Sequence, residues 1–184
     1  ILITGDLAST VENKGYNIIA SPGNGLQLMA MNNSNEALSD LRVRQAINYA
    51  VDKRALIEAV WWGYGEEIGS HFPVVLKEYI DLSDTYGYDP EKAKQILDEA
   101  GIVDTDGDGI RELDGQNINL RYISYENRLL NDFSDAHAQY LAELGIGVVQ
   151  EYGSSDDHWS KLAALDYDFN NNNWITVGTG DPLA

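Results

Sequence analysis

Helices and strands are expected to alternate along the second half of this chain, and that alternation restricts its fold most. "DPEKAKQILDEAG" (Asp89 to Gly101) has an Asp cap, a proline in the first turn and a terminal glycine, as short helices do. A strand, a helix, a strand, a capped helix and a last strand are expected at 117–124, 130–144, 146–152, 154–165 and 167–177. The pattern predicts an α/β fold, a mixed sheet with helices on both faces.

The first half of the chain is less regular. Residues 1–14 are expected to form a short strand and a polar turn, and 15–20 and 26–32 are expected to be strands around the turn "SPGNG". In "LSDLRVRQAINYAVDKRALIEAVWWGYG" (38–65) the apolar residues fall at helical spacing. Ser39 or Asp40 can cap a first helix and Asp52 a second, so two successive helices are predicted.

The size and charge of the chain limit the functions that it can have. The 184 residues can build one hydrophobic core, and we expect a single α/β lobe over residues 1–184. Thirty acidic and twelve basic residues give a net charge of −18, which repels phosphate and so excludes a nucleic-acid partner. There is no cysteine, hence no disulfide or thiolate site. The chain opens on "ILITGDL" and stops on "GTGDPLA", which we interpret as a piece of a longer protein.

The sharpest local motif is the acidic loop "DTDGDGIRE". Asp104, Asp106 and Asp108 with Gly109 match positions one, three, five and six of a calcium loop. Gly115 stands where the loop's closing glutamate belongs, so Glu112 or Asp114 is the candidate fourth ligand. Two interpretations stay open: a structural calcium site of low affinity, or an acidic turn between a helix and a strand. No other cofactor is expected.

Catalytic patterns are missing from the sequence. His71, His137 and His158 are scattered and lack partners at metal-ligand spacing. His137 falls on a helical apolar stripe and is predicted to be structural and partly buried, whereas His158, beside two aspartates, is predicted to lie in a solvated cluster. No serine stands on a nucleophile elbow. We therefore expect a protein that is not an enzyme.

Several ordered motifs resemble one family. The segment 38–65 is similar to the hallmark segment of the solute-binding proteins of peptide and nickel ABC transporters, with "NN" before it and "GYG" at its end. The likeness continues through "YDPEKAKQILDEAGIVDTDGDGIRELDG", "LAELGIGVVQEYGSSDDHWSKLAALDYDF" and "NWITVGTGDP", in the family's order. The chain is thus identified as the middle part of such a protein.

The resemblance implies a fold and a function. It implies one lobe of a two-lobed, periplasmic-binding-protein-like fold that closes on a ligand and presents it to a membrane ABC permease. The location implied is extracytoplasmic, either in the periplasm or as a cell-surface lipoprotein. Oligopeptides or dipeptides are the expected ligands, with nickel complexes, sugars or another small solute as alternatives. The piece itself is expected to be monomeric and to bind ligand poorly, because a cleft needs two walls.

The resemblance assigns roles to only some residues. The resemblance places ligand along the last strand, so Trp174, Ile175 and Thr176 are predicted to bind it, and Trp62 and Tyr64 are predicted to face the cleft. Peptide-specific members carry an Asp about three residues after the tryptophan, to hold the peptide's ammonium group.

This sequence departs from that pattern. It has Val177 at the position of the aspartate, so Asp181 is the substitute that we predict.

Two other classes of function are weighed against transport. The first is an interaction domain stabilised by calcium, and the second is a hydrolase that uses paired carboxylates.

Overall fold

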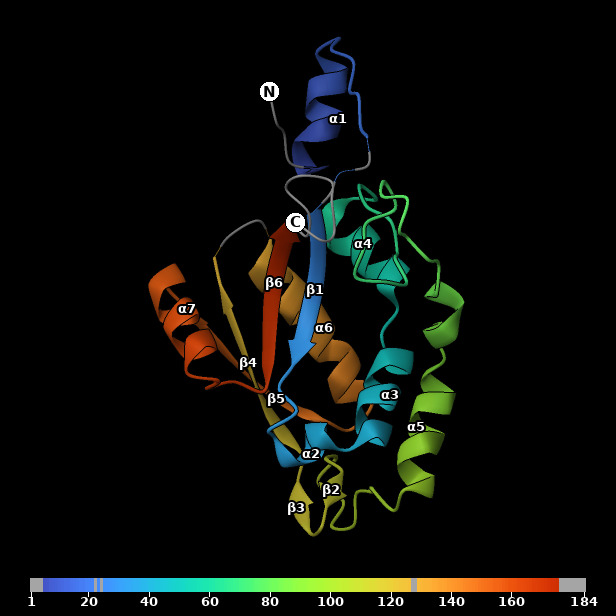
Figure 1. Ribbon diagram of the computed structural model, residues 1–184, viewed down its shortest axis with the longest axis vertical. Coiled ribbons are helices and arrows are strands. Elements are labelled where there is room, and N and C mark those ends of the chain that lie inside the picture. The colour runs from blue at the N-terminus through green and yellow to red at the C-terminus, as the bar shows by residue number, and fades with distance from the viewer. Residues whose placement is uncertain (1–4, 22, 24, 127–128, 176–184) are drawn as a thin grey trace. The chain divides into compact units, whose positions relative to one another are not determined.

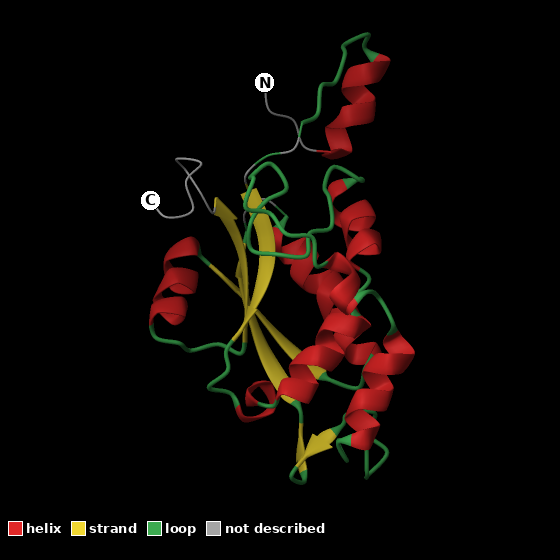
Figure 2. Ribbon diagram, turned by 45° about the vertical axis from the view of Figure 1, so that its right-hand side comes forward, coloured by secondary structure: helices red, strands yellow, loops and turns green. Residues whose placement is uncertain are grey.

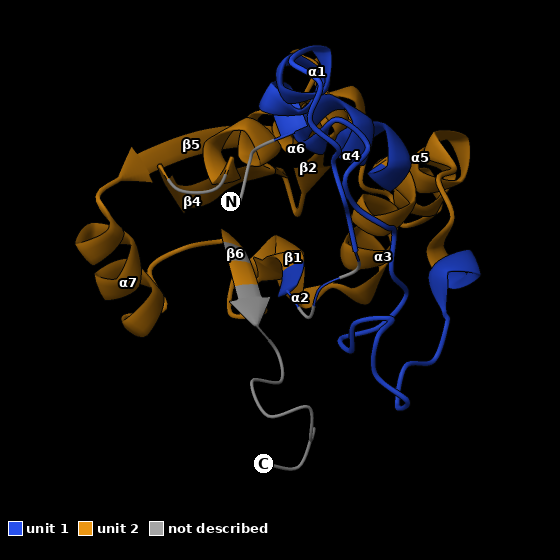
Figure 3. Ribbon diagram, turned by 90° about the horizontal axis from the view of Figure 1, so that it is seen from above, with its two compact units in different colours: residues 1–26, 53–85, 174–184 blue, residues 27–52, 86–173 orange. Residues whose placement is uncertain are grey.

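The computed structural model describes residues 5–21, 23, 25–126 and 129–175. These residues divide into two compact units, with unit 1 drawn from 1–26, 53–85 and 174–184 and unit 2 from 27–52 and 86–173 (Figure 3). In the described part of the chain, no helix has both the length and the apolar composition that crossing a bilayer requires.

Unit 2 contains nearly all of a four-stranded sheet. Its strands are β1 (Gly25–Met31), β4 (Asn119–Tyr125), β5 (Gly147–Gly153) and β6 (Phe169–Ile175), in the order β1-β6-β4-β5 (Figure 1). β4 pairs in parallel with both β5 and β6. β1 runs opposite to β6. The predicted mixed sheet is therefore confirmed.

The two crossover helices lie on opposite faces of this sheet. α6 (Leu130–Glu143) leads from β4 to β5, and α7 (Ser155–Ala163) leads from β5 back across β4 to β6. Connections between parallel strands of one sheet are right-handed almost without exception, so a reversal in the direction of winding moves the connecting helix to the other face. Figure 2 shows α7 on one side of the strands and the other helices of unit 2 on the opposite side.

The core of unit 2 lies between the sheet and the helices on the α6 side. α3 (Leu41–Ala50) packs against α5 (Pro90–Glu99), and the short α2 (Glu36–Ser39) precedes α3. Of the two predicted caps of α3, Asp40 is the one used, with its carboxylate 2.8 Å from the Arg42 N–H. The fully buried core side chains include Leu38, Val43, Ile47, Leu97, Leu120, Tyr122, Leu141 and Phe169.

A small hairpin that the sequence analysis missed follows the acidic loop. β2 (Glu112–Leu113) and β3 (Gln116–Asn117) are antiparallel and joined by Asp114 and Gly115. Both turn residues have positive φ, 51° and 77°. An Asp-Gly pair between short strands favours such a turn, which was the available signal.

Unit 1 corrects the prediction for the start of the chain. A short strand and a polar turn were predicted over 1–14, but residues 5–13 form a helix, α1 (Gly5–Asn13), and residues 1–4 lie outside the described part of the chain. Residues 15–20 are not a strand either. The β-branched opening residues suggested a strand, but Ala8 and Val11 stand three apart, which is helical spacing, and Ala8 is buried. α4 (Lys53–Trp61) is the second of the two predicted helices, and η1 (Ser83–Tyr86) leads into unit 2.

Candidate functional site

The order of the strands singles out one edge of the sheet. The connection from β4 goes to β5 on one side, and the chain then returns to β6 on the other side of β4. In open α/β sheets, ligands bind at the carboxyl ends of the strands where the direction of winding reverses. Here that position lies at the ends of β4 and β6, next to Tyr125.

Three aromatic side chains gather at this edge on the α7 face. The ring of Tyr125 lies 4.6 Å from that of His158 and 6.4 Å from that of Trp159, both on α7. Tyr125 and His158 are covered, while Trp159 remains 43% exposed. An indole supported from below and open above is a suitable contact surface for an organic ligand.

On the α6 face, amide side chains fasten β6 in place. Gln27 of β1 donates to the Asn171 carbonyl and accepts from Asn173, 3.3 Å away. Asn171, which is fully buried, donates to the Leu130 carbonyl at 2.6 Å and to the Ser134 hydroxyl at 3.2 Å. These bonds tie β6 to both β1 and α6, so the strand presents its carboxyl end as a fixed edge.

Ion pairs hold α7 against the strands. Arg121 of β4 contacts Glu151 at 2.9 Å and Asp166 at 2.6 Å. Lys161 of α7 contacts Glu151 and Asp157, each at 3.1 Å. Hydrogen bonds from Arg121 and Lys161 lower the pKa of the Glu151 carboxyl to about 2. The charges below the aromatic group therefore satisfy one another and position α7.

The histidine predictions had different outcomes. His137 is 3% exposed, as expected for a structural residue on an apolar stripe. The prediction for His158 was wrong, because it is 1% exposed under Tyr125 and not part of a solvated cluster. A polar neighbourhood in sequence did not reveal that this position of α7 faces β4. Burial lowers the pKa of His158 below its usual value.

The acidic loop does bring the three predicted aspartates together. One carboxylate oxygen from each of Asp104, Asp106 and Asp108 lies within 4.8 Å of the others. Glu112 has a different environment, since its two oxygens accept hydrogen bonds from the Thr105 N–H at 2.8 Å and the Thr105 hydroxyl at 2.9 Å. Backbone N–H groups of Gly109 and Gly107 lower the pKa of Asp104. The loop is thus closed by its own hydrogen bonds.

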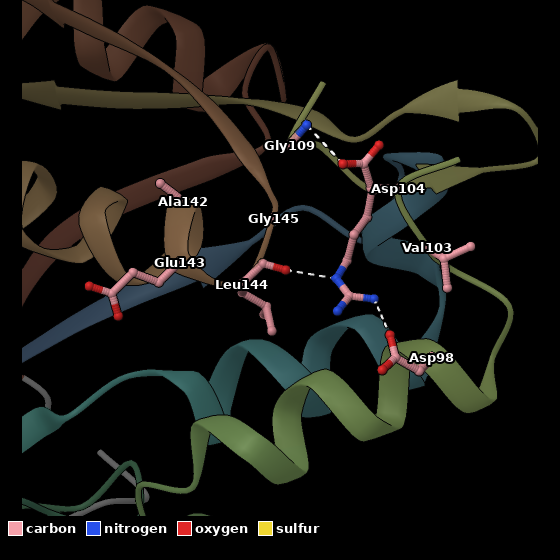
Figure 4. A pocket seen from close by; sticks show the side chains of 9 residues that line it. Asp98, Val103, Asp104, Gly109, Ala142, Glu143, Leu144 and Gly145 are labelled. Atoms are coloured by element: carbon pink, nitrogen blue, oxygen red, sulfur yellow. Dashed lines mark hydrogen bonds and ion pairs between the residues drawn. The ribbon is translucent and has the colours of Figure 1, made fainter. Parts of the chain in front are cut away.

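A pocket of about 260 Å³ lies beside this loop (Figure 4). Its central side chain, Arg111, donates to the Leu144 carbonyl at 2.8 Å, the Ile102 carbonyl at 2.7 Å and the Asp98 carboxylate at 2.5 Å. Every one of these bonds joins the end of one helix to another segment. We therefore interpret the pocket as the surface above a structural arginine.

The structure places the predicted ligand residues as follows. Trp174 and Ile175 are the last two residues of β6, at the carboxyl edge. Thr176 and Asp181 lie outside the described residues. Trp62 and Tyr64 belong to unit 1 and are exposed. Tyr125 and Trp159 were missed, although an aromatic residue at the end of a parallel strand was a usable signal.

Comparison with known proteins identifies the family. The family model of bacterial extracellular solute-binding proteins, family 5 Middle, matches residues 2–184. The chain belongs to this family. The resemblance inferred from its motifs is thereby confirmed. Among family 5 relatives, it is 41% identical to heme-binding protein A of Haemophilus influenzae over 96 residues, 52% of this chain and 18% of the relative. It is 39% identical to the dipeptide-binding protein of Escherichia coli over 97 residues, 53% of this chain and 18% of that protein.

Solved structures agree with this family 5 assignment. The oligopeptide-binding protein AppA of Bacillus subtilis, in complex with a nonapeptide, matches with a TM-score of 0.80 and 26% identity over 94% of this chain and 36% of AppA. NikA of Brucella suis, in complex with Fe(III)-EDTA, matches with a TM-score of 0.80 and 25% identity over 94% of this chain and 35% of NikA. The chain spans 18% of the length of the two curated relatives.

Proposed function

We propose that this chain is the ligand-capturing middle part of an ABC-transporter substrate-binding protein for dipeptides or oligopeptides, acting outside the cytoplasm. The observation that carries the proposal is the carboxyl edge, where Trp159 stands open above Tyr125 and β6 is held fixed beside it. A fixed strand end offers backbone groups to an extended peptide, and an indole covers apolar side chains. The role is binding and delivery to a membrane permease, without chemistry.

The peptide class is favoured over other solutes by two likenesses. The relative from Escherichia coli is named a dipeptide-binding protein, and AppA was solved with a nonapeptide. Heme and an Fe(III) chelate are named for other relatives, and they are the competing ligands. Since all of these ligands are organic, an open aromatic edge serves each of them, and only a binding experiment separates them.

Trp159→Ala in the full-length protein is expected to weaken peptide binding about tenfold, or roughly 1.4 kcal/mol, since it removes the open indole. Isothermal titration calorimetry with defined di- to nonapeptide pools measures this. Val149→Ala is the matched control and should leave the affinity unchanged. Val149 is also an exposed apolar residue, but it lies near the amino end of β5, away from the carboxyl edge of the sheet. If heme or a metal chelate binds and no peptide does, the peptide proposal is wrong.

The same calorimetry applies to the 184-residue chain alone. We expect this chain to bind peptide at least about 100-fold more weakly than the full-length protein does, a difference of roughly 2.7 kcal/mol. The reason is that other parts of the protein supply the second wall of the cleft. Micromolar affinity of the chain alone would show that it contains a complete site.

We also propose that the loop of Asp104, Asp106 and Asp108 binds calcium weakly, on the strength of its three converging carboxylates. Without a glutamate at position twelve, a dissociation constant on the order of 1 mM is expected. At roughly 10 mM calcium such a site adds about 1.4 kcal/mol, or about 4 °C in melting temperature. The measurement is a thermal melt with calcium, with magnesium and with chelator.

Asp106→Asn is the matched variant for the calcium melt, and it should lose the calcium-dependent shift while melting normally in chelator. An equal shift with magnesium, or none with calcium, leaves the loop as an acidic turn. A shift above about 10 °C would instead favour an interaction domain that is organised by calcium.

A further inference from the structure

Four tyrosines of unit 2 form a cluster where α3, α5 and α6 meet, which we call the tyrosine patch: Tyr49, Tyr86, Tyr88 and Tyr140. The rings of Tyr49 and Tyr86 lie 5.2 Å apart, edge to face, and those of Tyr88 and Tyr140 lie 6.2 Å apart, also edge to face. Lys92 lies 4.0 Å from the centre of the Tyr49 ring and 2.7 Å from its hydroxyl. The patch is therefore an ordered aromatic surface.

The patch lies on the outside of the core. Tyr49 packs against the buried cluster that α3, α5, α6 and the sheet form, but none of the four tyrosines is fully buried. Tyr88 is 47% exposed. Ordered tyrosines that keep part of their surface open are enriched among residues that dominate binding at protein interfaces.

The patch is also separate from the proposed ligand edge. α6 begins at Leu130, next to the carboxyl ends of the strands, and Tyr140 lies ten residues further along the same helix. At 1.5 Å per residue this places Tyr140 about 15 Å from the start of the helix. A partner on the patch would therefore leave the ligand edge accessible.

Carboxylates surround the patch. Burial raises the pKa of the Tyr140 hydroxyl most, and the charges of Asp52 and, more weakly, Glu143 raise it further. Asp89 and Glu91 stand at the start of α5, beside Tyr88 in sequence. Two lysines stand among these carboxylates: Lys92 is engaged with Tyr49, and Lys94 pairs with Glu91 at 3.3 Å. Four carboxylates against two lysines leave the rim with a net negative charge, which suits a basic partner.

This acidity excludes several partners. Nucleic acid and anionic lipid head groups are repelled by an acidic rim on a chain with a net charge of −18. A second copy, docking patch to patch, would bring the same carboxylates together, and like charges in an interface are unfavourable. The partner that remains after these exclusions is a basic surface on a different protein.

We propose that the tyrosine patch docks onto a basic extracytoplasmic loop of the membrane permease that receives the ligand. The proposal rests on the proposed function, and it assigns delivery to a surface other than the one that captures ligand. Tyrosine rings stack well on arginine side chains, and the acidic rim steers a basic loop towards them.

The test uses the full-length binding protein loaded with a peptide that it binds, together with its permease and ATPase subunits in proteoliposomes. ATP hydrolysis is measured against the concentration of binding protein. Tyr88→Ser and Glu143→Lys are each expected to raise the half-saturating concentration about tenfold, while peptide affinity and melting temperature stay unchanged. Raising the salt from 50 to 300 mM should weaken the wild type more than Glu143→Lys.

Tyr16→Ser is the matched control, since Tyr16 is an exposed tyrosine outside the patch. Unchanged half-saturation in both patch variants overturns the proposal, and so does a loss of peptide affinity in them, which would assign the patch to ligand capture. A variant that alters the oligomeric state of the protein in light scattering would point to self-association instead. If the wild type binds no peptide at all, it is the proposed function that fails.

Discussion

Phe169→Ala is expected to lower the free energy of unfolding of the 184-residue chain by about 3–5 kcal/mol, the usual cost of deleting a buried phenyl ring. Phe169 begins β6 and is fully buried. Its ring lies 5.5 Å from that of Tyr122 on β4 and 6.1 Å from that of His137 on α6. Because three elements meet on this ring, the cavity cannot collapse without moving one of them.

The effect should reach the ligand edge as well. Phe169 anchors the start of β6, and Asn171 with its partners fixes the strand two residues further on, so a loosened β6 presents its carboxyl end less rigidly. Urea unfolding followed by circular dichroism measures the loss of stability. Leu165→Ala, at an exposed position just before β6, is the control and should change stability by less than about 0.5 kcal/mol. A loss below about 1 kcal/mol for Phe169→Ala would show that this ring is not central to the core.

The sequence predicted those elements whose pattern is local. α5 has a cap, a proline and an ending glycine within thirteen residues, and β4 alternates apolar and polar side chains, so both were predicted nearly at their observed bounds. Residues 1–14 were predicted as a short strand and a polar turn, and α1 was missed, because the helical spacing of apolar residues there is short. Local pattern was too short there to decide.

The candidate site was harder to predict because it is assembled by topology. Tyr125 and Trp159 are thirty-four positions apart in sequence, and they meet only because α7 returns across β4. His158 shows the same limit, since two neighbouring aspartates suggested solvent while the helix turns it towards the sheet. By contrast, the three aspartates of the acidic loop lie within five residues, and the structure brings them together as their spacing suggested.

Acid is expected to destabilise the chain through His137. Burial between β4, α6 and β6 lowers the pKa of the His137 imidazole to about 4, from an ordinary value of 6.5. The unfolded chain therefore takes up a proton at a pH where the folded chain does not. The stability that depends on neutral His137 is fully present above pH 6.5 and is lost as the pH falls from 6.5 to about 4, by about 3 kcal/mol in all.

His137→Phe separates this effect from other titrations. The phenyl ring can keep the contacts that His137 makes with Tyr122, Phe133 and Phe169, and it carries no proton. Between pH 7.5 and 5 the wild type should lose about 2 kcal/mol more stability than His137→Phe, as measured by urea unfolding. His158 stays in both proteins and cancels in the comparison. Glu151, whose pKa is held at about 2, titrates below this range. Parallel stability profiles for the two proteins would mean that His137 has an ordinary pKa, and that its environment is wetter than the packing around it indicates.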